Sequence, residues 1–311
     1  MNPVLLTGAT GFIGQHLQQA ILAGGTGVVA QVRPSSRHPD RLLRGVEKLS
    51  IDLADSDRLD AAVARAAAVI YCAGSVRGRN ADDFRRANVS GVRSVVDSMN
   101  RTARNIPLLL ISSLAASRPQ VSDYAKSKHL GEMQVVERAE FPWTIFRPPA
   151  VYGPGDREML PILKLARKGI ITPVGPRDQR VSLIHVDDLA AAALAWLESP
   201  EKCSGRVYTL DDGHHRGYSW EEIALAAGTG SYRRINIPGW ILFAAGRANL
   251  FLSRLLGYAP MLTPGKAREL TQPDWLCNNR DLVEDIDWSP KITLERGVTA
   301  LFEPGGELLN K

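Results

Sequence analysis

Three side chains that together can move a proton occur close to one another in this 311-residue sequence. Tyr124 and Lys128 match the spacing Tyr-x-x-x-Lys, which puts both on one face of a helix. Ser113 follows an apolar run that is predicted to be a strand. The ordinary pKa of a phenol is about 10, and a nearby ammonium charge lowers it. The pattern therefore predicts acid/base chemistry, with Tyr124 exchanging the proton, Lys128 lowering its pKa and Ser113 holding a substrate oxygen.

A glycine-rich turn lies directly after the first apolar run, in the stretch TGATGFIG at 7–14. Its glycines allow a tight turn, a close approach of backbone to a pyrophosphate, and close packing of the following helix. The helix N-terminus adds free N–H groups and the positive end of a dipole. We therefore expect a dinucleotide to bind here. The residues assigned to that contact are Gly8, Thr10, Gly11, Phe12, Ile13 and Gly14.

The residues after the second predicted strand indicate which nicotinamide cofactor binds. An acidic side chain at this place accepts from a ribose 2′-hydroxyl and repels a 2′-phosphate. The sequence instead has Arg33, followed by Ser35, Ser36 and Arg37, and no acid occurs before Asp40. Arg33 can pair with a phosphate, and Ser35, Ser36 or Arg37 can add donors. NADP(H) is therefore favoured, with NAD(H) as the alternative.

Further cofactor contacts are expected where later strands end. Asp52 and Leu53 follow the third predicted strand, where Asp52 is suited to hold the adenine amine. Ala73 and Gly74 follow the fourth strand and let the backbone lie beside the cofactor. Tyr124 and Lys128 complete this set, since Lys128 can also bind the nicotinamide ribose.

Short apolar runs alternate with helical patterns through the first half of the chain, which is typical of repeated βα units. The class is α/β, with a Rossmann-type doubly wound parallel sheet and a smaller, mostly C-terminal α+β substrate domain. The dinucleotide-binding domain is expected at 1–150, with 181–200 returning to it. The substrate domain is expected at 151–180 and 201–311. The predicted strands are 3–6, 27–32, 46–51, 69–72, 108–111, 143–147 and 181–185. The predicted helices are 13–23, 56–67, 81–99, 122–139 and 187–197.

Composition limits the other possibilities. The net charge is +5, which a phosphorylated cofactor accounts for without nucleic acid. Three widely spaced cysteines and a His214-His215 pair show no metal-ligand spacing, so no metal is expected. The first residues lack the features of a signal peptide, and a cytoplasmic protein is expected. The apolar stretch 239–258 contains Arg247 near its middle. It is therefore predicted to be a water-soluble helical segment rather than a membrane span, with surface membrane association or an oligomer contact as alternatives.

Taken together, these motifs resemble the extended short-chain dehydrogenase/reductases, also called the NAD-dependent epimerase/dehydratase superfamily. The resemblance runs along nearly the whole chain. It rests on the glycine turn, Asp52-Leu53, the stretch NVSG at 88–91, Ser112-Ser113, Tyr124 to Lys128, RP at 147–148, VYGPG at 151–155 and HVDDLA at 185–190. It implies that Asn88 supports the active-site helix and a proton relay. It also implies that Pro148 and Val151 lie at the loop lining the nicotinamide, and that two helices of the nucleotide domain form a homodimer.

The segment from Leu262 to Trp288 resembles the 3β-hydroxysteroid dehydrogenase and dihydroflavonol-reductase branch. Epimerases of the superfamily usually carry an arginine where this chain has Val181, and Arg180 is one residue away, on the opposite side of a strand. These features favour an NADP(H)-dependent oxidoreductase that transfers hydride to or from an apolar alcohol or ketone. A sugar-nucleotide epimerase or dehydratase is the first alternative, and a non-catalytic dinucleotide-binding sensor or assembly protein is the second.

The interval between Ser113 and Tyr124 is shorter than the resemblance predicts, since a loop that closes over the substrate normally fills it. Ser112, Ser117 and Ser122 are therefore alternatives to Ser113 as the acting serine.

Overall fold

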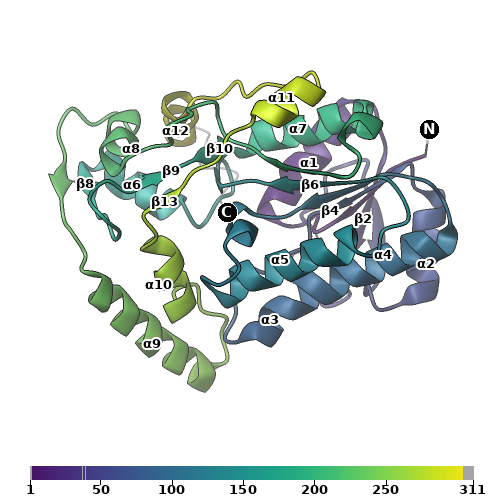
Figure 1. Ribbon diagram of the computed structural model, residues 1–311, viewed down its shortest axis with the longest axis horizontal. Coiled ribbons are helices and arrows are strands. Elements are labelled where there is room, and N and C mark those ends of the chain that lie inside the picture. Colours follow the sequence, from purple (N-terminus) through teal and green to yellow (C-terminus); the bar gives the residue numbers. More distant parts are fainter. Residues whose placement is uncertain (1, 37, 39, 304–311) are drawn as a thin grey trace.

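A seven-stranded parallel sheet forms the centre of the protein in this computed structural model, which describes residues 2–36, 38 and 40–303 (Figure 1). The strand order is β11-β6-β5-β4-β1-β2-β3, the doubly wound arrangement expected from the sequence. The strands are β1 (Val4–Thr7), β2 (Val28–Val32), β3 (Glu47–Ser50), β4 (Ala68–Tyr71), β5 (Leu108–Ile111), β6 (Trp143–Arg147) and β11 (Arg206–Thr209).

Helices cover both faces of this sheet, which explains why its central strands are continuous apolar runs. Every residue of β1, β4 and β5 is buried. On one face α1 (Phe12–Ala23) packs against α7 (Val186–Glu198), and Trp196 of α7 donates to the Thr144 hydroxyl at 2.9 Å. On the other face lie α2 (Ser56–Arg65), α4 (Gly91–Thr102) and α5 (Asp123–Val136) (Figure 1). Because the strands are parallel, the carboxyl ends that carry the predicted site residues lie along the same edge of the sheet.

The helix predicted over 81–99 is not continuous. It consists of α3 (Ala81–Arg85), a π-helical turn at Arg86–Ser90, and α4. The Tyr71 hydroxyl donates to the Ala87 carbonyl at 2.6 Å and so satisfies one acceptor within this turn. Gly91 leaves room for that phenol, because a Cβ there would lie 2.3 Å from the Tyr71 oxygen. Such a turn depends on a partner from another strand, which helical periodicity does not reveal.

The second part of the molecule is built from short elements. Paired strands are β7 (Ala150–Tyr152) with β10 (Leu183–His185), β8 (Ile170–Ile171) with β12 (Arg233–Arg234), and β9 (Arg180–Val181) with β13 (Asp274–Trp275). The helices are α6 (Leu160–Arg167), α8 (Trp220–Ala226), α9 (Gly239–Leu256), α10 (Pro264–Leu270), α11 (Arg280–Asp285) and α12 (Leu294–Phe302). The predicted strand at 181–185 is thus divided into β9 and β10. The break falls at Ser182, whose hydroxyl accepts from the Cys277 amide at 3.1 Å.

The predicted domain boundaries differ from the structure in one region. Strand β11 lies in the segment 201–311, yet it pairs with β6 and forms an edge of the large sheet. Leu282, Ile286 and Trp288 also join the apolar core between the sheet and α7. An edge strand with exposed residues such as Arg206 and Val207 lacks the apolar run of a central strand, so its pattern did not indicate the sheet.

Candidate active site

The glycine turn joins β1 to α1 and contacts the end of β4. Gly8 has a φ of 69°, and a Cβ there would lie 2.6 Å from the Ala73 nitrogen. At Gly14 a Cβ would lie 2.2 Å from the Gly8 carbonyl oxygen. The Ala73 amide donates to the Thr7 hydroxyl at 3.2 Å, which ties the two strand ends together. Only glycine permits this approach of the turn, the helix and the fourth strand.

The N-terminus of α1 has the properties of a phosphate site. No side chain caps it at Gly11, and its first turn carries no acidic residue. Gly11 is exposed, and Thr10, Phe12 and Ile13 are half-buried around it. Unmet backbone donors and the helix dipole favour a phosphate here. The turn therefore fits the pyrophosphate of a dinucleotide.

Residues predicted to select the cofactor lie at the ends of the neighbouring strands β2 and β3. Arg33 is exposed and follows β2 directly, and the Ser36 amide donates to the Arg33 carbonyl at 2.9 Å. Asp52 is exposed after β3, and its carboxylate accepts from the Ala54 amide at 3.0 Å. Leu53 packs into the core beneath. Arg37, which is also predicted to donate to the phosphate, lies outside the described residues.

Tyr124 and Ser113 meet at the carboxyl end of β5. Tyr124 lies in the first turn of α5 and is partly buried, and the Ser113 side chain lies near its phenol. The ring of Phe84 packs edge-on against the phenol ring, with 6.1 Å between centroids. Burial raises the pKa of Tyr124, the Ser113 hydroxyl opposes that rise, and the Glu269 charge adds to it. The phenol is therefore protonated at neutral pH.

The other candidate serines have different partners. Ser112 donates to Glu132 at 2.5 Å, and Ser117 donates to the Leu114 carbonyl at 2.7 Å. Ser122 caps α5 and bonds to Glu269. Of these four serines, Ser113 is the one whose hydroxyl influences the pKa of Tyr124.

Lys128 lies one helical turn after Tyr124 and is buried. Its ammonium donates to the Ile111 carbonyl at 2.9 Å, and burial lowers its pKa to about 8. A Cβ at Gly74 would lie 3.9 Å from this nitrogen, so the end of β4 passes beside it. The cation that lowers the pKa of Tyr124 in the structure is Lys266, and the phenol's pKa is raised overall. The expectation that Lys128 brings that pKa toward neutrality is therefore not met in this state of the protein.

Asn88 connects the π-helical turn to α5. Its side-chain amide donates to the Ser127 hydroxyl at 2.9 Å and to the Ser75 carbonyl at 3.0 Å. Its oxygen accepts from the Ser75 amide at 2.9 Å. Every one of these bonds is internal, so Asn88 holds the loop after β4 against the helix that carries Tyr124 and Lys128.

The depressed pKa of Lys128 predicts a pH-dependent stability. Between pH 8 and 10.5 the unfolded chain binds the Lys128 proton and the folded protein does not. The free energy of unfolding should therefore rise with pH across this window, by up to about 3 kcal/mol. Urea unfolding at several pH values measures the slope in the wild type, in Lys128→Met and in Lys126→Met, an exposed lysine of the same helix. The contribution should vanish only in Lys128→Met, and equal slopes in all three proteins would contradict it.

A buried ion pair that sequence reasoning missed lies behind the site. Arg147 donates to Glu132 through Nε at 2.9 Å and through Nη2 at 2.5 Å. Ser112 donates to the same carboxylate. The next residue, Pro148, is buried, and its carbonyl accepts from the Leu114 amide at 2.8 Å. This set fixes the ends of β5 and β6 around Ser113. Val151 is half-buried in β7, a few residues further on.

Helix α10 packs against the short segment between Ser113 and Tyr124. Its buried Glu269 bonds to Ser122 and accepts from Lys266 at 2.9 Å. Its Arg268 donates to the Val121 carbonyl at 2.8 Å. A segment from the C-terminal part of the chain therefore packs against the end of this interval. The stretch LTPGKAREL at 262–270, which includes α10, contributes to the family resemblance. Its sequence does not predict which turn of the chain the helix contacts.

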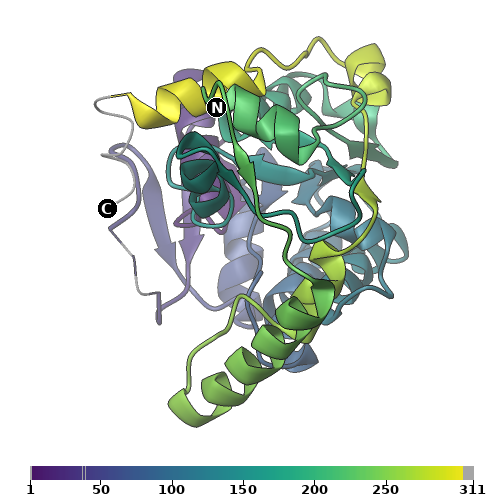
Figure 2. The same cartoon turned by 90° about the vertical axis from the view of Figure 1, so that its left-hand side faces the viewer.

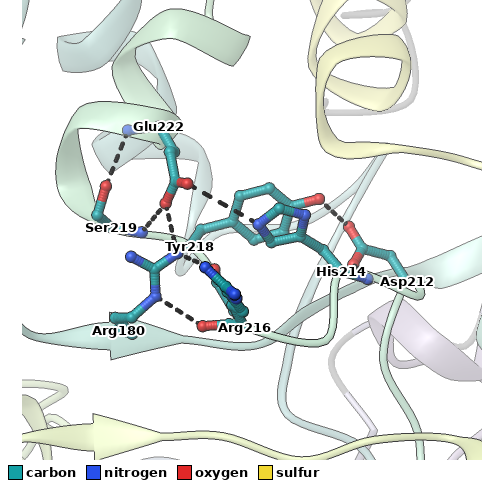
Figure 3. A network of polar contacts seen from close by, with 8 residues as sticks. Arg180, Asp212, His214, Arg216, Tyr218, Ser219 and Glu222 are labelled. Atoms are coloured by element: carbon teal, nitrogen blue, oxygen red, sulfur yellow. Dashed lines mark hydrogen bonds and ion pairs between the residues drawn. The ribbon is translucent and has the colours of Figure 1, made fainter.

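Arg180 belongs to a separate network, drawn in Figure 3. Its guanidinium donates to the Glu222 carboxylate at 2.9 Å and to the Arg216 carbonyl at 2.6 Å. His214 stacks on Tyr218, with 4.4 Å between ring centroids, and lies 3.9 Å from Glu222. Through these contacts Arg180 holds β9 against the start of α8. In the described part of the chain, no group of three or more His, Cys, Asp or Glu is arranged to hold a metal ion.

The parallel sheet, the glycine turn and the Ser/Tyr/Lys arrangement define an NAD(P)-dependent enzyme of the extended short-chain dehydrogenase/reductase type. The chain belongs to the NAD dependent epimerase/dehydratase family, whose sequence model matches residues 4–210. It is 35% identical over 286 residues to a ceramide reductase of Caulobacter vibrioides, covering 91% of this chain and 88% of the relative. A 2-alkyl-3-oxoalkanoate reductase of Stenotrophomonas maltophilia is 27% identical, covering 96% and 98%. The crystal structure of a UDP-glucose 4-epimerase from Thermotoga maritima has the same fold, with a TM-score of 0.72 at 17% identity, covering 99% and 97%.

Proposed function

We propose that this protein is an NADP(H)-dependent reductase of an apolar carbonyl substrate. The observation that carries the proposal is the position of the protonated phenol of Tyr124, near the Ser113 hydroxyl and one helical turn before Lys128, at the edge of the sheet where the glycine turn lies. When bound, the reduced nicotinamide supplies the hydride to the carbonyl carbon.

The side chains of the site supply the proton. The Ser113 hydroxyl orients the carbonyl oxygen of the substrate, and the phenol of Tyr124 donates its proton to that oxygen as negative charge develops there. A raised phenol pKa suits this direction, because the donor is fully protonated before the reaction. Lys128 bonds the ribose hydroxyls of the cofactor next to Gly74. Asn88 acts as a positioning residue for the helix.

The substrate class is inferred from the contacts of Arg180 and from the names of two relatives. Arg180, the arginine nearest the position that meets a diphosphate in related epimerases, is held by Glu222 and by backbone carbonyls. Two relatives are named for a ceramide and for a 2-alkyl-3-oxoalkanoate, not for a sugar nucleotide. Both points support a lipid-like ketone over a sugar nucleotide.

Net oxidation of the cofactor distinguishes a reductase from an epimerase. NADPH and NADH oxidation would be followed with a long-chain 3-oxo lipid, a 2-alkyl-3-oxo acid and UDP-glucose, with product analysis for each. We expect net NADPH oxidation with one of the apolar ketones and none with UDP-glucose. Conversion of UDP-glucose to its 4-epimer without net cofactor oxidation would replace this proposal with the epimerase activity.

Arg33 is predicted to select the phosphorylated cofactor. Arg33→Ala should raise the Kd for NADPH about tenfold, since an exposed charge-assisted contact to the 2′-phosphate is lost, and leave the Kd for NADH within about twofold. Quenching of protein fluorescence measures both. Arg65→Ala, an exposed arginine paired with Glu47 at 3.2 Å, is the matched control and should bind both cofactors normally. An equal loss of affinity for NADPH and NADH in Arg33→Ala would count against this role.

A further inference from the structure

Helix α9 has a large apolar surface that nothing in the described part of the chain covers. Four of its side chains are largely exposed: Trp240 at 71%, Phe251 at 63%, Leu255 at 67% and Leu256 at 72%. Ile241 and Leu252 are also exposed. Figures 1 and 2 both show the helix along the lower edge of the molecule, away from the sheet. Such a patch is uncommon on a monomeric protein and marks an interaction surface.

The exposed side chains form one continuous face. At 3.6 residues per turn, Trp240, Phe251 and Leu255 fall along one stripe of the helix, and Ile241 and Leu252 fall along the adjacent stripe. Only small residues, Ala244, Ala245 and Ala248, separate them on that face. The arc from Trp240 round to Leu256 is therefore apolar.

The opposite side of α9 is anchored to α10. A Cβ at Gly246 would lie 2.9 Å from the Thr263 carbonyl carbon, so the helix packs tightly there. Ser253 is buried, and the Asn249 side chain donates to the Leu262 carbonyl at 2.9 Å. The helix is thus held rigidly by its polar and small side, and its apolar face points away from that contact.

Positive charge borders this face. Arg247 and Arg254 lie together at one edge of the apolar arc, both are exposed, and neither has an ion pair among the described residues. No Asp or Glu occurs between Glu222 and Glu269, a stretch that contains six Lys and Arg residues. In a symmetric contact with a second copy, this surface would oppose its own positive charge. Anionic lipid headgroups complement it.

We propose that α9 binds the surface of an anionic lipid bilayer, lying in the plane of the interface with Trp240, Phe251 and Leu255 among the acyl chains. Arg247 and Arg254 then lie at the headgroup level and pair with lipid phosphates. A helix with an apolar face, a basic edge and an aromatic residue near its start has the composition of interfacial helices. Among the described residues, none of the helices has both the length and the apolar character to span a bilayer.

This surface is connected to the active site through α10. The same helix that packs on α9 carries Lys266 and Glu269, which lie beside Tyr124 and Ser122. If the proposed reductase activity holds, the bilayer is also the source from which an apolar ketone reaches the phenol. Vesicle binding itself requires no catalysis and is tested separately.

Sedimentation with sucrose-loaded vesicles tests the proposal on the full chain. Vesicles contain phosphatidylcholine alone or equal parts of phosphatidylcholine and phosphatidylglycerol. We expect the wild type to sediment with the anionic vesicles, and Phe251→Ser/Leu255→Ser to lose at least about tenfold in partition coefficient. Arg247→Gln/Arg254→Gln should lose about tenfold on anionic vesicles and show little change on neutral ones. The control Val207→Ser/Val283→Ser removes two exposed apolar side chains on β11 and α11 and should bind as the wild type does.

Two outcomes would overturn the proposal. One is a wild type that stays in the supernatant with both vesicle types, or a Phe251→Ser/Leu255→Ser variant that sediments as well as the wild type. The other is a wild-type dimer in analytical ultracentrifugation that the same variant dissociates, without vesicle binding, which would assign the face to a second copy. Circular dichroism melting checks that the variants are folded. Failure of the reductase proposal looks different, because NADPH turnover would then be absent while vesicle binding is intact.

Discussion

Replacing Tyr124 by phenylalanine is expected to lower NADPH-dependent turnover of a carbonyl substrate about a thousandfold, within the range of general acid catalysis. The variant keeps the ring that packs on Phe84 and loses only the hydroxyl near Ser113. Cofactor affinity should therefore stay within about twofold of the wild type. Stopped-flow measurement of NADPH oxidation and a fluorescence titration give the two quantities.

The matched control is Tyr258→Phe, which removes a hydroxyl that donates to the Asn249 carbonyl at 3.2 Å, outside the site. Its turnover should equal that of the wild type with a water-soluble ketone. A Tyr124→Phe enzyme that keeps more than about a tenth of wild-type turnover would remove this phenol from the role of proton donor.

Replacing Glu132 by alanine is expected to lower the free energy of unfolding by about 3–5 kcal/mol, because it leaves Arg147 partly buried without its carboxylate and Ser112 without its acceptor. Turnover should fall as well, since these contacts fix the strand ends beside Ser113. Urea unfolding monitored by circular dichroism measures the loss.

Two further variants test whether the broken ion pair causes the loss of stability in Glu132→Ala. Glu137→Ala removes an exposed carboxylate at the end of the same helix and should cost less than about 0.5 kcal/mol. Glu132→Leu/Arg147→Met removes both charges and should recover most of the stability, since a buried apolar pair has no desolvation cost. If Glu132→Ala unfolds at the same urea concentration as the wild type, the ion pair does not stabilise the fold.

Much of the fold followed from local pattern. The buried runs that became β1, β4 and β5 were readable because both faces of the sheet are covered, so every residue in these strands is apolar or small. The doubly wound order was confirmed. Strand β11 was missed because an edge strand with exposed residues carries no such run. The break in the helix at Arg86–Ser90 was missed because Tyr71, from another strand, supplies the donor to Ala87.

By itself, the sequence determined which residues occupy the glycine turn and that Tyr124 and Lys128 share a helix face, since both depend on the geometry of neighbouring residues. Only the tertiary structure decided which of four serines meets the phenol, because Ser112 and Ser122 are bonded by Glu132 and by Glu269, a residue 147 positions away. It also placed Glu269 and Lys266 of α10 near the phenol, where they act on its pKa in opposite directions. Charges act through space, and the burial and distance that set their effect arise only when α10 packs against α5.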